Sequence, residues 1–478
     1  MSDNDNAFSI QLEGFNEGFS PLAHIDSKTF VGNKGQASDM KADIISLPGF
    51  LTQSPALASL TNGTQAGVVD QLIRFILDKP TAADVTYAIG TTKLFKLSST
   101  AVVSGGSPSW PQAVTNMTEG ESVIRLKANI YGFFNKSSGG DILKMPIATE
   151  VIDHTWGSVT AAALQNAPHP SACKEDVMVF GNGRYLGVYI EGSATLDVQK
   201  LDFGEGSEIA DVLFHSNTWW IAVNFGEGKR GQIYLYDGSA ISNILSDEVG
   251  VGDQKIGFLY VQNGIIYVAY DDKSSSGFAI GWLNGRTIKP LRYFTGTLPT
   301  HRQKALYKNT LLFVSSPDIW SIGAPVEQLP VQISKLSDGG YSTLGALACP
   351  FGTPMIASSE STNFRIAKFS GYSTDSLWKS IMLDVTSERD LGKINTVIVT
   401  TKALVGSAKA EITIEGNQGV LTSNTLSVTG VGLTRHVFKT ITLGACEDIR
   451  VVVSFANGDA TNYCPIRKIN LLGSFVER

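Results

Sequence analysis

The sequence predicts an all-β protein made of an extended N-terminal segment, a β-propeller of about seven blades and a C-terminal β-sandwich of jelly-roll type. Three observations lead to this prediction. Glycine fills 48 of the 478 positions and only 17% of the residues are charged, whereas the exposed faces of helical bundles need Glu, Lys and Arg. A strand–turn–strand unit recurs between residues 67 and 376. Six strand-like runs then follow in residues 377–478.

The composition narrows the range of functions. A net charge of -6 provides no electrostatic reason to expect nucleic-acid binding. The start, MSDNDNAFSIQLEGF, lacks the basic region and apolar core of a secretory signal, and no run reaches the roughly 18 apolar residues of a membrane span. We therefore expect synthesis in the cytosol, where Cys173, Cys349, Cys446 and Cys464 stay reduced. Whether Cys446 and Cys464 approach each other is left open.

Residues 1–66 are expected to form an extended arm used in assembly. The first 50 or so residues are rich in Gly, Asn, Ser and Asp and show no sustained period of 2.0 or 3.6. Such a segment cannot bury a face of its own, so we expect it to lie over its own domain or over a neighbouring subunit. Phe15 and Phe19 are its candidate contact residues.

Residues 67–376 are expected to form the propeller. The clearest repeat copies are residues 177–204, 212–238 and 258–285, and weaker copies start near residues 84, 123, 304 and 347. Asn-Gly pairs at Asn182 and Asn263 lie between apolar runs, which is the strongest short-range hairpin signal. The spacing of about 35 to 54 residues suits four-stranded blades, and we expect six to eight of them. A β-solenoid or stacked sandwiches are the alternatives. The run VVDQLIRF, from residue 68, is read as a strand, with a short amphipathic helix as its alternative.

Residues 377–478 are expected to form the sandwich. Several of the six runs alternate cleanly, for example with Ala410, Ile412 and Ile414 on one face. Asn457-Gly458 is its clearest hairpin signal. No linker rich in proline or charge precedes this domain, so we expect it to pack on the propeller.

The sequence predicts no catalytic residue, cofactor or metal site, and we expect the protein not to be an enzyme. The six histidines are scattered without metal-ligand spacing, and neither a nucleophile elbow nor a phosphate loop occurs. Residues 201–211 are only a poor approximation of a calcium loop and are read as an inter-blade loop. Trp110 and Trp156, in loops rich in Ser, Pro and Gly, are the best candidates for a contact surface.

Four parts of the chain carry a resemblance to a known family. These are GFNEGFSPLAHID from Gly14, DIISLPGFLTQSPALASLTNG from Asp43, DVTYAIGTTKLFKLS from Asp84, and the C-terminal runs WKSIMLDV, KINTVIVTTKAL, IRVVVSFANGD and IRKINLLG. In this order they resemble structural proteins of tailed-bacteriophage virions. The resemblance implies a non-enzymatic component of the tail, neck or baseplate that assembles in the host cytoplasm as a ring of identical subunits. Its partners would be other virion proteins and copies of itself, and removal of residues 1–45 would abolish incorporation but leave the propeller folded.

Two other functions stay open from the sequence alone. A host-surface adhesin would grip glycan with the sandwich or with one face of the propeller. A propeller glycoside hydrolase would need two acids within about 5 to 10 Å of each other in an open pocket.

Overall fold

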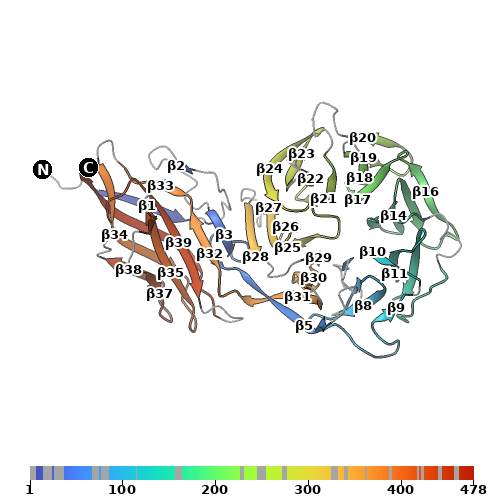
Figure 1. The fold of residues 1–478 in the computed structure, drawn as a ribbon, viewed down its shortest axis with the longest axis horizontal. Helices are drawn as coiled ribbons and strands as arrows, with labels where there is room; N and C mark the ends of the chain where they lie inside the picture. Colours follow the sequence, from blue (N-terminus) through green and yellow to red (C-terminus); the bar gives the residue numbers. More distant parts are fainter. Residues whose placement is uncertain are drawn as a thin grey trace.

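A computed structural model of the chain contains two β domains, a propeller and a sandwich, lying side by side (Figure 1). It describes residues 7–13, 15, 24–25, 37–66, 75–76, 85–114, 116–156, 164–226, 231–244, 254–271, 277–323, 332–337, 343–360, 363–386, 390–416, 419–420, 425–439, 444–456 and 462–477.

The described residues form seven small antiparallel sheets around the propeller axis, which confirms the predicted propeller and places the blade number at seven. Blades 1 to 3 consist of β6 (Phe75–Ile76), β7 (Thr86–Ile89), β8 (Lys93–Leu97) and β9 (Gln112–Ala113); β10 (Glu119–Leu126), β11 (Asn129–Asn135) and β12 (Gly140–Pro146); and β13 (Ser171–Lys174), β14 (Val177–Asn182), β15 (Tyr185–Ile190) and β16 (Leu196–Asp202). Blades 4 and 5 consist of β17 (Ser207–His215), β18 (Thr218–Phe225), β19 (Gln232–Tyr236) and β20 (Ile241–Asn243); and β21 (Ile256–Gln262), β22 (Ile265–Asp271), β23 (Gly277–Asn284) and β24 (Thr287–Thr295). Blades 6 and 7 consist of β25 (Lys304–Tyr307), β26 (Thr310–Ser315), β27 (Asp318–Gly323) and β28 (Gln332–Ser337); and β29 (Thr343–Ala348), β30 (Met355–Glu360), β31 (Asn363–Tyr372) and β5 (Pro55–Ala66).

The hairpin turns that define the repeat lie where the Asn-Gly signals predict them. Asn263 and Gly264 both have positive φ and connect β21 to β22 as a two-residue turn. The repeat copy at residue 177 starts one strand late, at β14, because its short first strand β13 carries no comparable signal. Of the run VVDQLIRF only Phe75 is described, and it begins β6.

The pair Trp219-Trp220 shows how the blades pack. The two side chains alternate across β18, so Trp219 is buried in the cluster shared with blade 3 and Trp220 packs on the cluster shared with blade 5. Alternation along the middle strands therefore provides a hydrophobic layer on both sides of a blade.

Blade 7 is completed by a strand that precedes the rest of the propeller in the chain. β5 pairs antiparallel with β31, with Ala58 opposite Lys368. At the irregular part of this pairing, a side chain on Gly63 would lie 2.7 Å from the Ile366 carbonyl, so glycine permits the close approach. The assignment of residues 55–66 to an arm is therefore wrong. The pairing covers an edge of blade 7 that would otherwise be open.

The sandwich has two sheets. We call the first the outer sheet; its order is β1 (Ala7–Glu13), β40 (Ile466–Glu477), β34 (Asp390–Thr401) and β38 (Arg435–Lys439). The second, the inner sheet, contains β2 (His24–Ile25), β33 (Met382–Asp384), β39 (Asp448–Ala456), β32 (Leu377–Ser380), β3 (Ala37–Asp43), β4 (Thr52–Gln53), β35 (Lys409–Gly416), β36 (Gly419–Val420) and β37 (Leu426–Val428). As predicted, Ala410, Ile412 and Ile414 all point into the core.

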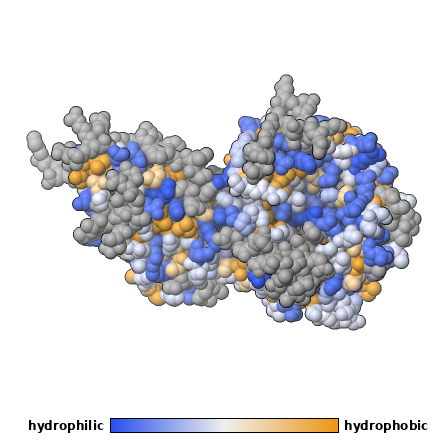
Figure 2. All heavy atoms as spheres, in the orientation of Figure 1, coloured by the Kyte–Doolittle hydropathy of each residue, from blue (hydrophilic) through white to orange (hydrophobic). Residues whose placement is uncertain are grey.

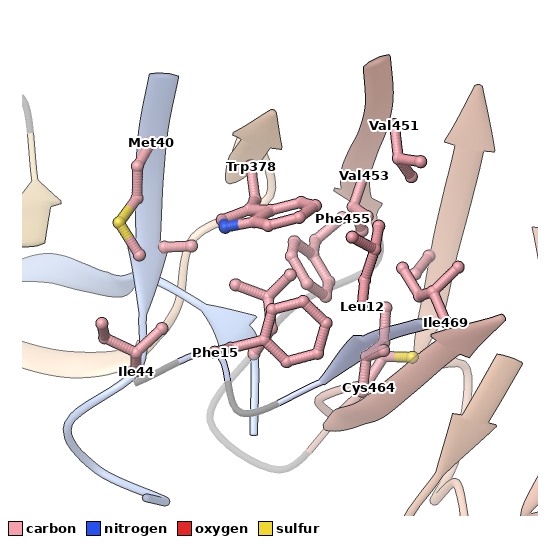
Figure 3. Packing of buried hydrophobic residues seen from close by; sticks show 14 of the residues in the cluster. Leu12, Phe15, Met40, Ile44, Trp378, Val451, Val453, Phe455, Cys464 and Ile469 are labelled. Carbon is pink, nitrogen blue, oxygen red and sulfur yellow. The ribbon is translucent and has the colours of Figure 1, made fainter. Parts of the chain in front are cut away.

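The segment before residue 54 belongs to the sandwich, which corrects the predicted domain boundaries of 1–66, 67–376 and 377–478. β1 pairs with β40 and β3 pairs with β32. Figure 3 shows Leu12, Phe15, Met40 and Ile44 packed among Trp378, Val453, Phe455 and Ile469 from the other end of the chain. The segment lacks a face of its own, as the sequence indicates, because its apolar residues complete the sandwich core, whose other members lie between Trp378 and Leu471.

One predicted hairpin is wrong. Asn457 and Gly458 lie outside the described residues, but the strands on either side, β39 and β40, belong to different sheets. The connection therefore crosses from the inner sheet to the outer sheet. An Asn-Gly signal marks a turn of the chain, but it does not determine which strand becomes the hydrogen-bonded partner.

The two domains share one hydrophobic cluster, which confirms that the sandwich packs on the propeller. The cluster runs from Phe15 and Trp378 in the sandwich through Ile44 and Ile45 to Tyr307 and other residues of blades 6 and 7. β3 of the inner sheet contacts β28 of blade 6, and the outer sheet lies farther from the propeller (Figure 1). In the described part of the chain, no helix has the length and apolar character needed to cross a membrane.

Candidate functional site

Two of the four residues predicted to form a contact surface are part of the core. Trp110 is only 4% exposed and packs in a cluster between blades 1 and 2, and Phe15 is 1% exposed with its ring edge-on to Trp378. The prediction of a contact role is therefore wrong for both. Trp156 is half-buried against Tyr131 and Tyr189, and Phe19 lies outside the described residues. Loop position misled the prediction, because a loop tryptophan can fold back onto its own blade.

The cysteines and histidines form no metal site within the described residues. All four cysteines are free thiols, and burial raises the pKa of Cys464 to about 12. His169 is fully buried and its Nδ1 lies 2.8 Å from the Gly181 carbonyl. Burial lowers the pKa of His169 to about 4, so the ring is neutral at physiological pH. Of residues 201–211, predicted to form an inter-blade loop, only 203–206 connect β16 to β17. Leu201 and Asp202 end β16, and the residues from Ser207 to Asp211 begin β17, so the prediction is right only for the middle of this segment.

Charged side chains link blades that are not neighbours in the ring. Lys304 of blade 6 forms an ion pair with Asp211 of blade 4, and its ammonium also donates a hydrogen bond to the Leu259 carbonyl of blade 5 at 2.7 Å. The same Asp211 oxygen, Oδ2, also accepts a hydrogen bond from the Leu259 amide at 2.7 Å. Burial raises the pKa of the Asp211 carboxyl, while the Lys304 ammonium opposes that rise. Figure 2 shows hydrophilic side chains gathered over the middle of the propeller.

A second ion pair crosses the ring to blade 2. Arg302, in the connection before β25, lies 3.2 Å from the Glu121 carboxylate and 3.9 Å from that of Glu119. Glu121 also accepts a hydrogen bond from Asn135 at 3.1 Å. Blades 2 and 6 are not neighbours in the ring, so this contact and that of Lys304 cross-link the propeller through its centre.

These axial acids differ from the open pair that a glycosidase uses. Glu121 and Asp211 are each only 2% exposed, and each lies against a cation. A glycosidase needs one proton-donating acid and one ionised carboxylate with direct access to the sugar. The axial charges instead hold blades at fixed positions, and sequence analysis missed them because their partners lie on distant strands.

A pocket of about 310 Å³ lies where the two domains meet. Its walls come from the end of β3 and the segment after it, from the start of β5, from the β25–β26 turn, and from the β29–β30 connection and the end of β31 in blade 7. The lining residues are Asp43, Ser46, Pro55, Tyr307, Lys308, Gly352, Thr353, Pro354, Phe369, Ser370, Gly371 and Tyr372. Small-molecule sites often lie between domains, and their volumes start at about 300 Å³. The resemblance and the repeat pattern provided no signal for it.

Exposed hydrophobic side chains concentrate on the other side of the sandwich. Six of the eleven large hydrophobic side chains that are exposed in the described part of the chain belong to the outer sheet or to loops beside it. Two of these, Leu472 and Val476, lie on β40 inside the sheet. We call the other four, which lie on β38 or in the loops beside it, the outer apolar edge: Val405, Val431, Leu433 and Val437. Val431 forms an isolated β-bridge with Leu404. Val437 belongs to β38, the last described strand of the outer sheet, and pairs with Ile398 of β34.

No protein-family model and no curated protein matches the sequence. Several solved structures are similar to the chain at low sequence identity, and one of them is a propeller. The extracellular domain of a putative hybrid two-component system from B. thetaiotaomicron is 11% identical, with a TM-score of 0.47, over 74% of this chain and 44% of that one. The chain thus spans less than half of that protein's length.

Two further structures extend the comparison. The Dos1 propeller is 9% identical over 66% of this chain and 94% of its own, with a TM-score of 0.39. A glycoside hydrolase family 43 arabinoxylan arabinofuranohydrolase from Bacillus subtilis is 12% identical over 89% of this chain and 96% of its own, with a TM-score of 0.27. At these identities the likeness concerns the fold alone.

Proposed function

We propose that the protein is a non-enzymatic structural component of a tailed-phage virion, placed in the tail, neck or baseplate and acting through contacts with copies of itself and with other virion proteins. The resemblance of the sequence to such proteins supports this proposal. The rigid, cross-linked propeller is also suited to a part that has to keep its shape in a large assembly.

The outer apolar edge is the observation that carries the proposal. Val431 is 70% exposed and Val405 is 57% exposed, and both lie beside β38, which is the last strand of the outer sheet among the residues that the structure describes. Contiguous exposed apolar surface and unpaired sheet edges mark interaction sites in proteins that are stable on their own. A neighbouring subunit that covers this edge would remove both features from water.

Replacing Val431 with aspartate tests the proposal. We expect Val431→Asp to fold normally but to be lost from particles by at least tenfold, because a buried, unpaired carboxylate destabilises an interface. Incorporation is measured by quantitative mass spectrometry of particles assembled in host cells in which the variant replaces the natural protein. Val151→Asp is the matched control, since Val151 is 54% exposed in the propeller. Equal incorporation of Val431→Asp and the control would contradict the proposal.

A glycan-binding appendage protein is the second candidate function. The pocket between the domains favours it, because aromatic rings and hydroxyl groups line the same cavity. This function is compatible with a place in the virion, since appendage proteins meet the host surface.

A further inference from the structure

We propose that the pocket between the propeller and the sandwich binds a neutral hexopyranose unit of a host-surface polysaccharide. This inference rests on the second candidate function and assigns it a site. The pocket is formed jointly by Asp43 and Ser46 of the sandwich segment and by Tyr307, Phe369 and Tyr372 of blades 6 and 7. A ligand there would touch both domains at once.

Asp43 supplies the main hydrogen-bond acceptor. Its side chain is 4% exposed, and its Oδ1 accepts hydrogen bonds from the amides of Ile45 and Ser46 at 2.8 and 2.9 Å. The other oxygen, Oδ2, accepts no hydrogen bond from the described residues. A carboxylate held in this way presents an acceptor to the pocket without moving, which suits recognition of sugar hydroxyls.

Hydroxyl groups lie next to this carboxylate. The Tyr307 hydroxyl lies 3.3 Å from Ser46 Oγ, and burial raises the pKa of Tyr307 to about 12, so it keeps its proton and can donate. Lys308 places its ammonium 5.2 Å from the centre of the Tyr307 ring. A sugar carries adjacent hydroxyls that each donate and accept, so it can satisfy Asp43 and Tyr307 together.

Aromatic rings supply the apolar wall. Tyr372 is half-buried and stacks on Tyr463 at 4.8 Å between ring centres and 22° between planes, which fixes its orientation. Phe369 stands edge-on to Tyr307 at 6.1 Å. The C–H face of a pyranose ring packs against such rigid rings with little loss of side-chain freedom. Because net charge in the lining is balanced between Asp43 and Lys308, a neutral sugar fits better than an acidic one.

The test measures binding of the full chain to an array of bacterial capsular and O-chain polysaccharides, followed by titration of the best-binding glycan. We expect saturable binding that falls about tenfold or more in Asp43→Asn and in Tyr372→Ala. Asp43→Asn keeps an oxygen for the two amides and replaces only the oxygen offered to the ligand. Tyr293→Ala is the control, because Tyr293 is exposed on β24, away from the residues that line the pocket. We expect this variant to bind glycan like the unaltered chain.

Two results would overturn the proposal: no binding of the unaltered chain to any glycan of the array, or an undiminished affinity in both pocket variants whose thermal unfolding is normal. Measuring particle incorporation of the same variants distinguishes a failure of the glycan-binding proposal from a failure of the virion proposal. We expect Asp43→Asn to enter particles normally and Val431→Asp to bind glycan normally as a free protein.

Discussion

Lys304 shows how much a single side chain can connect in this fold. Its ammonium contacts Asp211 of blade 4 and the Leu259 carbonyl of blade 5, although it belongs to blade 6. Replacing it with methionine would keep the volume of the side chain but would leave the Asp211 carboxylate buried without its cation. We expect Lys304→Met to lower the free energy of unfolding by about 3–5 kcal/mol, measured by urea denaturation.

A double variant checks the cause of this loss. In Lys304→Met with Asp211→Leu no buried charge remains, so we expect most of the stability to return. A double variant as unstable as the single one would show that packing, not the unpaired charge, determines the loss.

His169 provides a second prediction at the residue scale, for pH. Its pKa is about 4 in the folded protein and about 6.5 when unfolded. The folded state therefore binds fewer protons between these values, and the unfolded state gains stability as the pH falls from about 6.5 towards 4. His169 alone should remove about 3 kcal/mol from the free energy of unfolding over this range. In His169→Gln we expect urea denaturation at pH 7 and pH 4.5 to show a smaller difference than in the unaltered chain; an unchanged difference would contradict the assignment.

At the scale of elements, the N-terminal strands are the feature that changes the expectation most. β1 and β3 supply Leu12, Met40 and Ala42 to the sandwich core, where each is at most 1% exposed. Removal of residues 1–45 should therefore unfold the sandwich rather than detach an arm, because the remaining sheets lose strands and core together. The propeller should stay folded, because β5 remains.

Limited proteolysis with mass spectrometry measures this outcome. We expect a protected fragment that starts before residue 55 and ends near residue 372, with rapid cleavage in residues 377–478. Equal protection of both domains in the truncated chain would show that the sandwich does not depend on β1 and β3. Loss of particle incorporation by this truncation would then be explained by the unfolded sandwich.

At the scale of the whole molecule, the sequence predicted the fold class correctly but placed the domain boundaries wrongly. Local signals such as Asn263-Gly264 and the alternation at Ala410, Ile412 and Ile414 are enough to predict blades and strands. They do not predict which strands pair across the chain, so the places of β1, β3 and β5 were missed. The candidate site was missed for the same reason: Asp43 and Tyr307 meet only because two domains close on each other.

The pairing of β1 with β40 also affects how the protein is made. Ala7 lies opposite Ser474, so a strand that leaves the ribosome early has to wait for one translated more than 460 residues later. At about 5–20 residues per second this delay is roughly 20 to 90 s. During that time the blades can form one after another while Leu12 and Met40 stay exposed to water and to chaperones. Neither domain can close before its late partner strand is synthesised, and the propeller is the first to finish, when β31 reaches β5.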